Sequence, residues 1–444
     1  MKKLSLLLLS VFLIGLVSCK KETVDVSELL TTVPSSAAGV VVFNMEGMLK
    51  DAGCKIKDHD IIPGEEVKKL FDNASPSNKE LMILFEGNTG IEPKGAVIFY
   101  DTNRAFLTFA LYDTDKFCSF VEKHQGTSFI NGESGVKMAG NIAVKGAQAW
   151  ICLTSGKRID TDAIASYASL VPSQSFLVTP MGEKLLSDEE DIRGWGRIDV
   201  FLNNMLGVRD KNMATLGLGF LFEGAEAVKF SADFKKGEAE AEVVLLNSKG
   251  KPAKYQLPDD KVDVATLKSL GSTCDAMMAF TVTPKLVKKF DQLSSAFGGI
   301  LFGSMGDMFK NIDGTVGLVS CGTRYDQSVN GVITTKGEVS KSLKDMIADY
   351  TGSVNEDGKY LRFTKGDVKG NLSVEECAAE LKGSCLGIIY GADNDALGDV
   401  QPKTQGFKWF MMKLKPEDGG IEFEFEAKTT DPQQNALICI LKNM

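Results

Sequence analysis

One unit recurs along this chain and constrains its fold more than any other feature. It consists of an amphipathic helix, a connector of small residues, an apolar strand and a helix-capping residue. Repeated units of this kind bury their apolar faces against one another. In the first copy the connector is Pro34-Ser35-Ser36-Ala37, the predicted strand spans residues 39–43 and the cap is Asn44. The apolar residues of its predicted helix have the i, i+3, i+4, i+7 spacing of one helix face, and they are Val26, Leu29, Leu30 and Val33.

Three further copies follow the same order. Their predicted strands lie at residues 176–178, 276–282 and 386–390. Thr179-Pro180 and Thr283-Pro284 each place a capping hydroxyl before a proline at the first helical position, where the missing N–H costs nothing. Ser373 and Glu376 have the spacing of a capping box at the start of the fourth helix. These residues predict where helices begin.

Two long stretches alternate between apolar and polar residues, from Ala227 to Leu246 and from Phe407 to Ala427. A turn signal rich in Lys, Gly or Pro interrupts each of them. This pattern predicts antiparallel hairpins with one solvated face. The polar faces carry rows of glutamates, namely Glu238, Glu240, Glu242, Glu422, Glu424 and Glu426. The pattern favours a solvated sheet face for these rows over a cation site.

Together these patterns predict an α+β fold of antiparallel sheets with helices packed on one face. Because the unit and the hairpin occur in both halves, we interpret the chain as a tandem duplication into two similar lobes. Lys249-Gly250-Lys251-Pro252 marks the boundary, so the predicted lobes span residues 27–250 and 251–444. The first lobe is longer, and its extra residues are expected between Gly126 and Trp150. The alternative is a chance similarity of helix and strand patterns.

The N-terminus has the three-part order of a secretory signal peptide, with Lys2 and Lys3, an apolar run from Leu4 to Leu16, and small residues. The run is too short for a membrane span, which needs about 20 apolar residues. Leu16-Val17-Ser18-Cys19 resembles the bacterial lipobox, whose cysteine receives diacylglycerol and an acyl chain such as palmitate. We therefore predict a signal peptide at residues 1–18, lipid on Cys19 and a short tether at residues 19–26. The alternative is an ordinary signal peptide with an incidental cysteine.

The residue after the lipidated cysteine influences sorting in bacterial lipoproteins. Lys20 replaces the aspartate associated with retention in the inner membrane, which favours an outer-membrane address. Lys20-Lys21-Glu22 is mixed in charge, so the periplasmic and cell-surface faces both stay open.

The chain is acidic, and removal of Lys2 and Lys3 takes its formal net charge from -9 to -11. This charge argues against nucleic acid as a partner, because proteins bind phosphates through Lys and Arg. Apart from Cys19, eight cysteines remain, and we expect mostly free, buried thiols. Cys377 and Cys385 are the nearest pair in sequence, and the pairing of any disulfides stays open.

No motif in the chain predicts a reaction. His59 and His124 are the two histidines, and the cysteines lack zinc-ligand spacing, so no metal, cofactor or catalytic residue is predicted. The run from Asp393 to Asp399 resembles a calcium loop, but Leu397 occupies a ligand position, which favours a capped turn. Asp188-Glu189-Glu190-Asp191 is interpreted as a solvated loop rather than a pair of glycosidase acids.

Three tryptophans provide the remaining candidate site. Trp150, Trp195 and Trp409 have side chains suited to stacking on sugars, but so few tryptophans in 444 residues more often fill cores. The core interpretation is favoured for all three.

The lipobox followed by a helix, by residues 33–42 (VPSSAAGVVV) and by a short helix at residues 44–53 resembles uncharacterised lipoproteins of gut Bacteroidota that share a domain of unknown function. This resemblance implies an address and an architecture, and it carries no activity. We predict a non-catalytic binding or assembly module at the outer membrane, held by lipid on Cys19, with a protein or peptide partner. The alternatives are a carbohydrate-binding surface lipoprotein with a glycan ligand, and a hydrolase whose site is assembled from distant residues.

Overall fold

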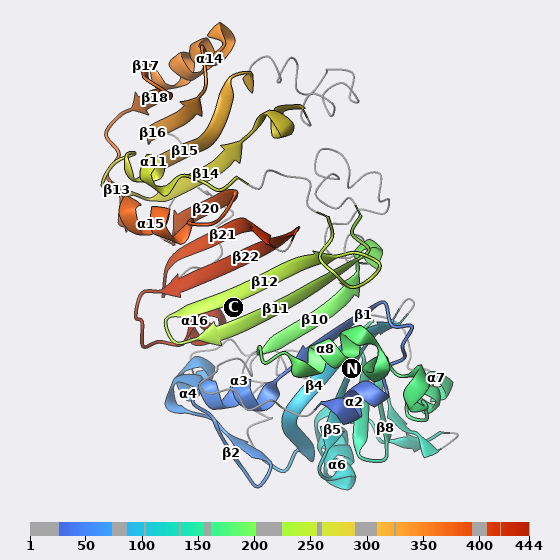
Figure 1. Ribbon diagram of the computed structural model, residues 1–444. Helices are drawn as coiled ribbons and strands as arrows, with labels where there is room; N and C mark the ends of the chain where they lie inside the picture. Colours follow the sequence, from blue (N-terminus) through green and yellow to red (C-terminus); the bar gives the residue numbers. More distant parts are fainter. Residues whose placement is uncertain are drawn as a thin grey trace.

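The protein is described by a computed structural model. The structure describes residues 26–72, 87–101, 104–132, 135–154, 161–200, 224–254, 260–288, 309–323, 326–392, 406–417 and 419–443. Within these ranges one antiparallel sheet joins 18 strands, and helices pack against it (Figure 1). The predicted α+β class with antiparallel strands is confirmed.

The first lobe is built around β1 (Gly39–Phe43), whose neighbours in the sheet are β4 and β10. The strand order is β9-β5-β4-β1-β10-β11-β12. The strands around β1 are β4 (Ile91–Asp101), β5 (Arg104–Leu111), β9 (Gln148–Cys152), β10 (Ile192–Arg197), β11 (Ala227–Lys235) and β12 (Glu238–Leu246).

The second lobe repeats this connectivity around β14 (Ala276–Val282). Its order is β18-β16-β15-β14-β20-β21-β22, which matches the first lobe strand for strand, and β17 pairs with β18. The other strands are β15 (Ile312–Thr323), β16 (Asp326–Thr335), β17 (Val354–Asp357), β18 (Tyr360–Lys365), β20 (Leu386–Gly391), β21 (Phe407–Glu417) and β22 (Gly420–Thr429). A duplication would produce this matching connectivity. That the two lobes arose by duplication of one sequence stays a prediction.

The two lobes join edge to edge through equivalent strands. β12 pairs antiparallel with β22, and Glu242 lies opposite Glu424 near the middle of the pairing. The junction therefore resembles the self-complementary interface of a symmetric dimer. Figure 1 shows the strands of both lobes as one continuous sheet. The C-terminal helix of the second lobe also packs in the core of the first lobe. Leu437 and Ile438 of α16 (Ala436–Asn443) belong to the same hydrophobic core as Phe43 and Phe109.

Helices cover both faces of the sheet, which corrects the expectation of one covered face. In β1, Val40 and Val42 are fully buried on one side, and Phe43 is 4% exposed on the other. An apolar run without alternation is typical of a strand buried on both faces. On the Val40 side lie α2 (Ser27–Thr31), α7 (Thr161–Tyr167) and α8 (Pro180–Ser187). On the Phe43 side lie α3 (Met45–Asp51), α4 (Glu65–Asp72), α6 (Thr114–Gln125) and α16.

The second lobe shows the same division. Leu267 of α11 (Val264–Lys268) and Cys377 of α15 (Val374–Glu380) pack with Ala279 of β14. Leu343 of α14 (Lys341–Thr351) packs on the opposite side with Val282 of the same strand. Each lobe is therefore a sheet between two helical layers.

The predicted strand at residues 176–178 is wrong, because these residues form the 3-10 helix η4 (Phe176–Val178). The Ser175 hydroxyl accepts a hydrogen bond from Leu177 N, and the backbone N–H of Phe176 donates to the Val33 carbonyl at 2.7 Å. These bonds turn the chain back toward α2. The equivalent strand of the first lobe is β10. Its Arg and Gly residues interrupt the apolar run that would predict a buried strand. Gly194 leaves room there for the Phe230 ring, since a Cβ would lie 2.2 Å from it.

The predicted caps are confirmed where the structure describes them. Asn44 accepts from Gly47 N at 3.0 Å, and Thr179 accepts from Gly182 N at the same distance. Ser373 accepts from Glu376 N at 3.3 Å. Three short strands lie where extra residues were expected in the first lobe, namely β6 (Ile130–Asn131), β7 (Lys137–Ala139) and β8 (Ile142–Lys145). Two small sheets pair β2 (Lys55–Lys57) with β3 (Asp60–Ile62), and β13 (Thr273–Cys274) with β19 (Leu372–Ser373).

The cysteines of the described residues occupy core positions. All eight are buried thiols, as predicted, and Cys377 and Cys385 belong to different hydrophobic clusters.

Candidate functional site

The candidate site lies on one face of the sheet where the two lobes meet. The alternation of β12 and β22 turns their glutamates to the same face, so that Glu240 lies opposite Glu426 and Glu242 opposite Glu424. Like charges directly opposite each other across a strand pair are destabilising. The sequence predicted each glutamate row but not that the rows would face each other.

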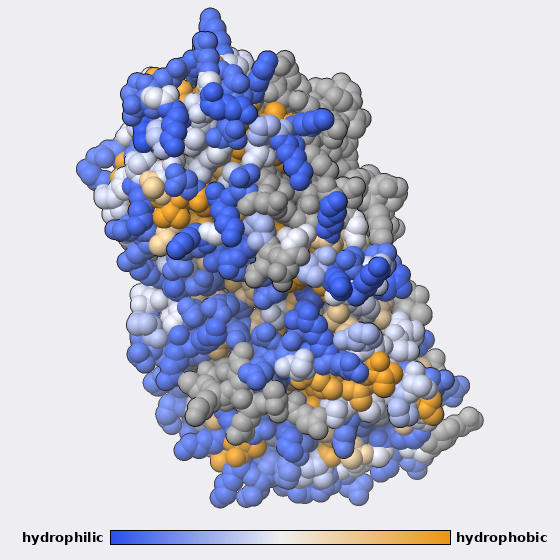
Figure 2. Space-filling model, in the orientation of Figure 1, coloured by the Kyte–Doolittle hydropathy of each residue, from blue (hydrophilic) through white to orange (hydrophobic). Residues whose placement is uncertain are grey.

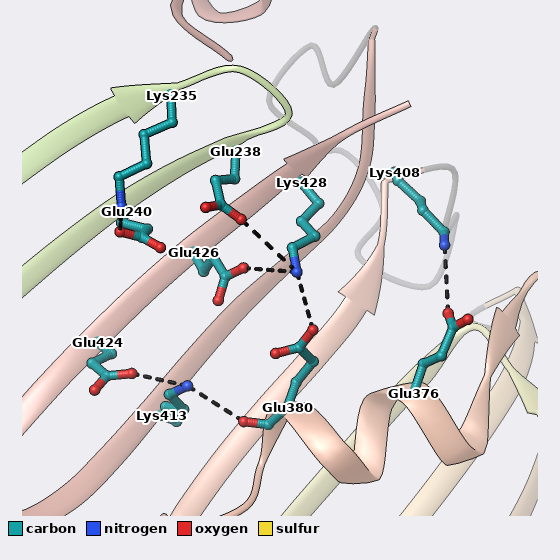
Figure 3. A network of polar contacts seen from close by, with 10 residues as sticks. All are labelled: Lys235, Glu238, Glu240, Glu376, Glu380, Lys408, Lys413, Glu424, Glu426 and Lys428. Carbon is teal, nitrogen blue, oxygen red and sulfur yellow. Dashed lines mark hydrogen bonds and ion pairs between the residues drawn. The ribbon is translucent and has the colours of Figure 1, made fainter. Parts of the chain in front are cut away.

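Lysines on the neighbouring strands compensate this repulsion (Figure 3). Lys413 of β21 is 8% exposed, and its Nζ lies 2.9 Å from Glu424 Oε2. The same ammonium donates to the backbone carbonyl of Glu380 at 3.3 Å. Lys415 contacts the other oxygen of this carboxylate, Glu424 Oε1. A carboxylate between two cations is held in one position, so this end of the junction is preorganised.

Lys428 forms a second centre at the junction. Its Nζ lies 3.3 Å from Glu426, 3.1 Å from Glu380 and 3.9 Å from Glu238, as Figure 3 shows. It also lies 5.2 Å from the centre of the Trp409 ring. This one ammonium therefore ties β12, β22 and α15 together. Beside it is a hollow of about 200 Å³ whose lining includes Glu376, Lys408 and Trp409.

The two glutamates near the centre have opposite pKa shifts. Burial acts to raise the pKa of Glu424, but hydrogen bonds with Glu422, Lys415 and Lys413 outweigh it and lower that pKa. Burial raises the pKa of Glu426, and the nearby charge of Lys428 only partly offsets this effect. The junction thus holds one carboxylate firmly charged and one that accepts a proton more readily.

A groove of about 330 Å³ follows this face of the junction, and we call it the seam groove. Its lining includes Ser231, Lys415 and seven carboxylates, which belong to Glu190, Asp233, Glu240, Glu242, Glu422, Glu424 and Glu426. Four lysines form ion pairs with some of these carboxylates, namely Lys235, Lys413, Lys415 and Lys428, so carboxylates outnumber lysines on this face. The seam groove is suited to a cationic group.

The acidic loop after α8 forms one wall of the seam groove. It surrounds Arg193, whose side chain is completely buried and donates from Nη1 to the Asp188 carbonyl. Burial lowers the pKa of Arg193, and the charges of Asp188 and Glu190 oppose that shift. Glu190 lines this wall, and its Oε2 atom is buried with no hydrogen-bond donor among the described residues.

This loop is not the solvated segment that the sequence suggested. Asp191 is fully buried and accepts from Phe234 N at 3.0 Å, and Asp188 pairs with Lys229 at 2.6 Å. The correction has a physical cause, since a buried guanidinium needs acceptors and counter-charges near it. The signal in the sequence was the arginine two residues after the four acids.

The tryptophans do not form an exposed platform for sugars. Trp150 is completely buried and Trp409 is 5% exposed. Trp195 is half-buried, with its ring 5.7 Å from that of Phe176. The core interpretation is confirmed for Trp150 and Trp409.

The histidines do not line the seam groove, and His59 lies in the turn between β2 and β3 whereas His124 lies on α6. His59 Nδ1 is 2.9 Å from Glu92 Oε2, and its ring stacks on Tyr112 at 4.3 Å. The His124 ring lies 4.9 Å from that of Phe120 on α6. In the part of the chain that the structure describes, no three His, Cys, Asp or Glu side chains gather as metal ligands would.

Two predicted features fall outside the described residues, namely the lipid attachment at Cys19 and the loop from Asp393 to Asp399. Among the helices that are described, none combines the length and the apolar character needed to cross a membrane.

No family model matches this chain. No curated protein matches it either. Solved structures of TP0453 are weakly similar to it. Crystal form III has 10% identity and a TM-score of 0.32 over 79% of this chain and 96% of that chain. Form IV has 11% identity and a TM-score of 0.33 over 49% and 79%. Form I has 9% identity and a TM-score of 0.30 over 82% and 97%. These likenesses are too weak to support an inference about function.

Proposed function

We propose that this chain is a non-catalytic binding module, anchored to the outer membrane by lipid on Cys19, whose seam groove receives a cationic segment of a protein or peptide partner. The observation that carries the binding proposal is the excess of carboxylates over lysines where the lobes join. The lipobox at residues 16–19 supports the anchor.

The groove suits a lysine or arginine side chain in three respects. Its volume of about 330 Å³ is at the small end of ligand pockets, so it accommodates a few side chains rather than a large ligand. The lysines hold the carboxylates in position before a ligand arrives, which lowers the ordering cost of binding. Glu190 also adds a carboxylate to the wall of the groove.

Binding is tested with a lysine-rich peptide and a matched peptide in which glutamine replaces each lysine. The full chain should bind the first more tightly, and added salt should weaken that binding, because charges in an open groove are screened. In the Glu190→Gln/Glu242→Gln double variant we expect about a tenfold loss of affinity, which corresponds to about 1.4 kcal/mol.

The matched control is Glu376→Gln, since this carboxylate is 68% exposed on α15 and does not line the seam groove. Calorimetric titration should show no change for the control. Unchanged affinity in the double variant, or an equal loss in the control, would contradict a binding site in the seam groove.

The anchor is tested separately with Cys19→Ser. The wild-type chain should fractionate with outer membranes and carry acyl chains on its N-terminal peptide in mass spectrometry. The variant should lack both properties, because the acylated sulfur is gone. A wild-type chain without acylation would refute the anchor and leave the binding proposal intact.

A further inference from the structure

Two exposed valines lie beside the start of the first helix. Val171 precedes η3 (Pro172–Gln174) and is 50% exposed, and Val178 ends η4 and is 49% exposed. The neighbouring Leu170 and Leu177 are half-buried. Figure 2 shows an apolar patch on this part of the first lobe, over the region of α2 and α8. We call these four residues the valine patch.

The valine patch is held rigidly against the N-terminal segment. Ser35 N donates to the Gln174 carbonyl at 2.8 Å, and the Ser175 hydroxyl donates to the Leu30 carbonyl at 2.9 Å. Ser175 is itself completely buried. Because these bonds join the middle of the segment between Val171 and Val178 to Ser35 and to Leu30 of α2, the patch and the start of the described chain form one unit.

The predicted anchor limits how far this unit can lie from the membrane. Eight peptide units separate Cys19 from Ser27, where α2 begins. A fully extended chain of that length spans at most about 30 Å. The face that carries α2 is therefore the part of the described molecule tied closest to the lipid.

We propose that the valine patch contacts the bilayer, with Val171 and Val178 at the boundary between headgroups and acyl chains. This inference rests on the proposed lipidation of Cys19. The other strongly exposed apolar side chains, such as Ile130, Met346 and Tyr350, lie on elements that are not bonded to α2. The position of the tether therefore selects this patch as the membrane contact.

The contact should be apolar rather than electrostatic. Charged side chains near the patch are mixed in sign, with Glu183 and Lys184 on α8 and Glu28 on α2. The chain as a whole is acidic, which disfavours attraction to anionic headgroups. Because the contact is apolar, the valine patch should enter zwitterionic and anionic bilayers to a similar extent.

The test places a nitroxide on Val178→Cys in the mature, lipidated full-length chain. The cysteines of the described residues are buried, so the chain without this substitution serves as the control for background labelling. Accessibility of the nitroxide to oxygen, which dissolves in lipid, is compared with accessibility to a water-soluble nickel chelate. Vesicles of phosphatidylcholine, with and without phosphatidylglycerol, provide the bilayers.

On vesicles we expect a several-fold rise in the ratio of oxygen to nickel accessibility at position 178 with both lipids. A label at Met346→Cys on α14 in the second lobe should show no rise. Val171→Asp should reduce the rise at position 178, since it places a charge in the patch. The inference is overturned if the chain floats with the vesicles but the label at position 178 keeps its solution ratio. A chain that does not float refutes the anchor instead.

Discussion

Replacement of Lys413 by methionine tests whether the ion pairs beside the junction stabilise the fold. Lys413 is 8% exposed, and its ammonium contacts Glu424 at 2.9 Å and the Glu380 carbonyl at 3.3 Å. Methionine has a similar length and no charge, so it removes these contacts without a large change in packing. Glu424 would then keep Lys415 as its cation while Glu242 still lies opposite it.

The expected loss in the free energy of unfolding is about 1–3 kcal/mol. Removal of one partner from a fully buried ion pair costs about 3–5 kcal/mol. Glu424 is 20% exposed and retains Lys415, which brings the cost below that range. A second substitution, Glu424→Met, removes the carboxylate that lost its partner. The double variant should therefore recover at least half of the loss, because an apolar pair can replace a buried ion pair.

A double-mutant cycle is measured by urea denaturation of the wild type, both single variants and the double variant. The control is Lys408→Met, because Lys408 and Glu376 are 47% and 68% exposed and 3.5 Å apart. Such surface pairs contribute about 0–1 kcal/mol. Strictly additive losses at positions 413 and 424 would refute the reasoning, since independent sites show no coupling.

The effect of Lys413→Met should also depend on pH. The pKa of Glu424 is lowered in the folded state, so its contribution to stability is present above its unfolded pKa and is lost as the pH falls through its folded pKa. The difference in the free energy of unfolding between the wild type and the variant should therefore become smaller as the pH falls. A gap that widens as the pH falls would contradict this assignment.

Three further substitutions test other parts of the fold. Trp150→Ala should cost about 3–5 kcal/mol in thermal or urea unfolding, because a completely buried ring leaves a cavity. Thr179→Ala should cost about 1 kcal/mol, since it removes the acceptor for Gly182 N at the start of α8. Burial raises the pKa of Glu426 in the folded state, so the wild type loses stability as the pH rises through that pKa, and Glu426→Gln should abolish this loss in a pH series of unfolding measurements.

The helix starts and the hairpins could be predicted because they depend on short-range interactions. Asn44, Thr179 and Ser373 each bond to a backbone N–H three residues ahead, so the residues that make the contact are adjacent in the sequence. The two hairpins show their alternation over long stretches, and each strand pairs with the next one along the chain. Local geometry decides both features.

The errors arose where a distant partner decides the outcome. Phe176 has the apolar character of a strand residue, but its N–H bonds to the Val33 carbonyl and the segment forms a 3-10 helix. The acidic loop was expected to be solvated, but Asp191 accepts from Phe234 N and Asp188 pairs with Lys229, both on β11. Neither outcome can be read from neighbouring residues.

By itself the sequence determined which side chains of the two hairpins share a face, because alternation along a strand follows from backbone geometry. Only the tertiary structure decided that β12 and β22 lie side by side and turn Glu240 toward Glu426. Pairing between strands so far apart in the chain depends on how both lobes pack, since any exposed strand edge offers the same backbone donors and acceptors. The acidic seam groove is a product of that pairing.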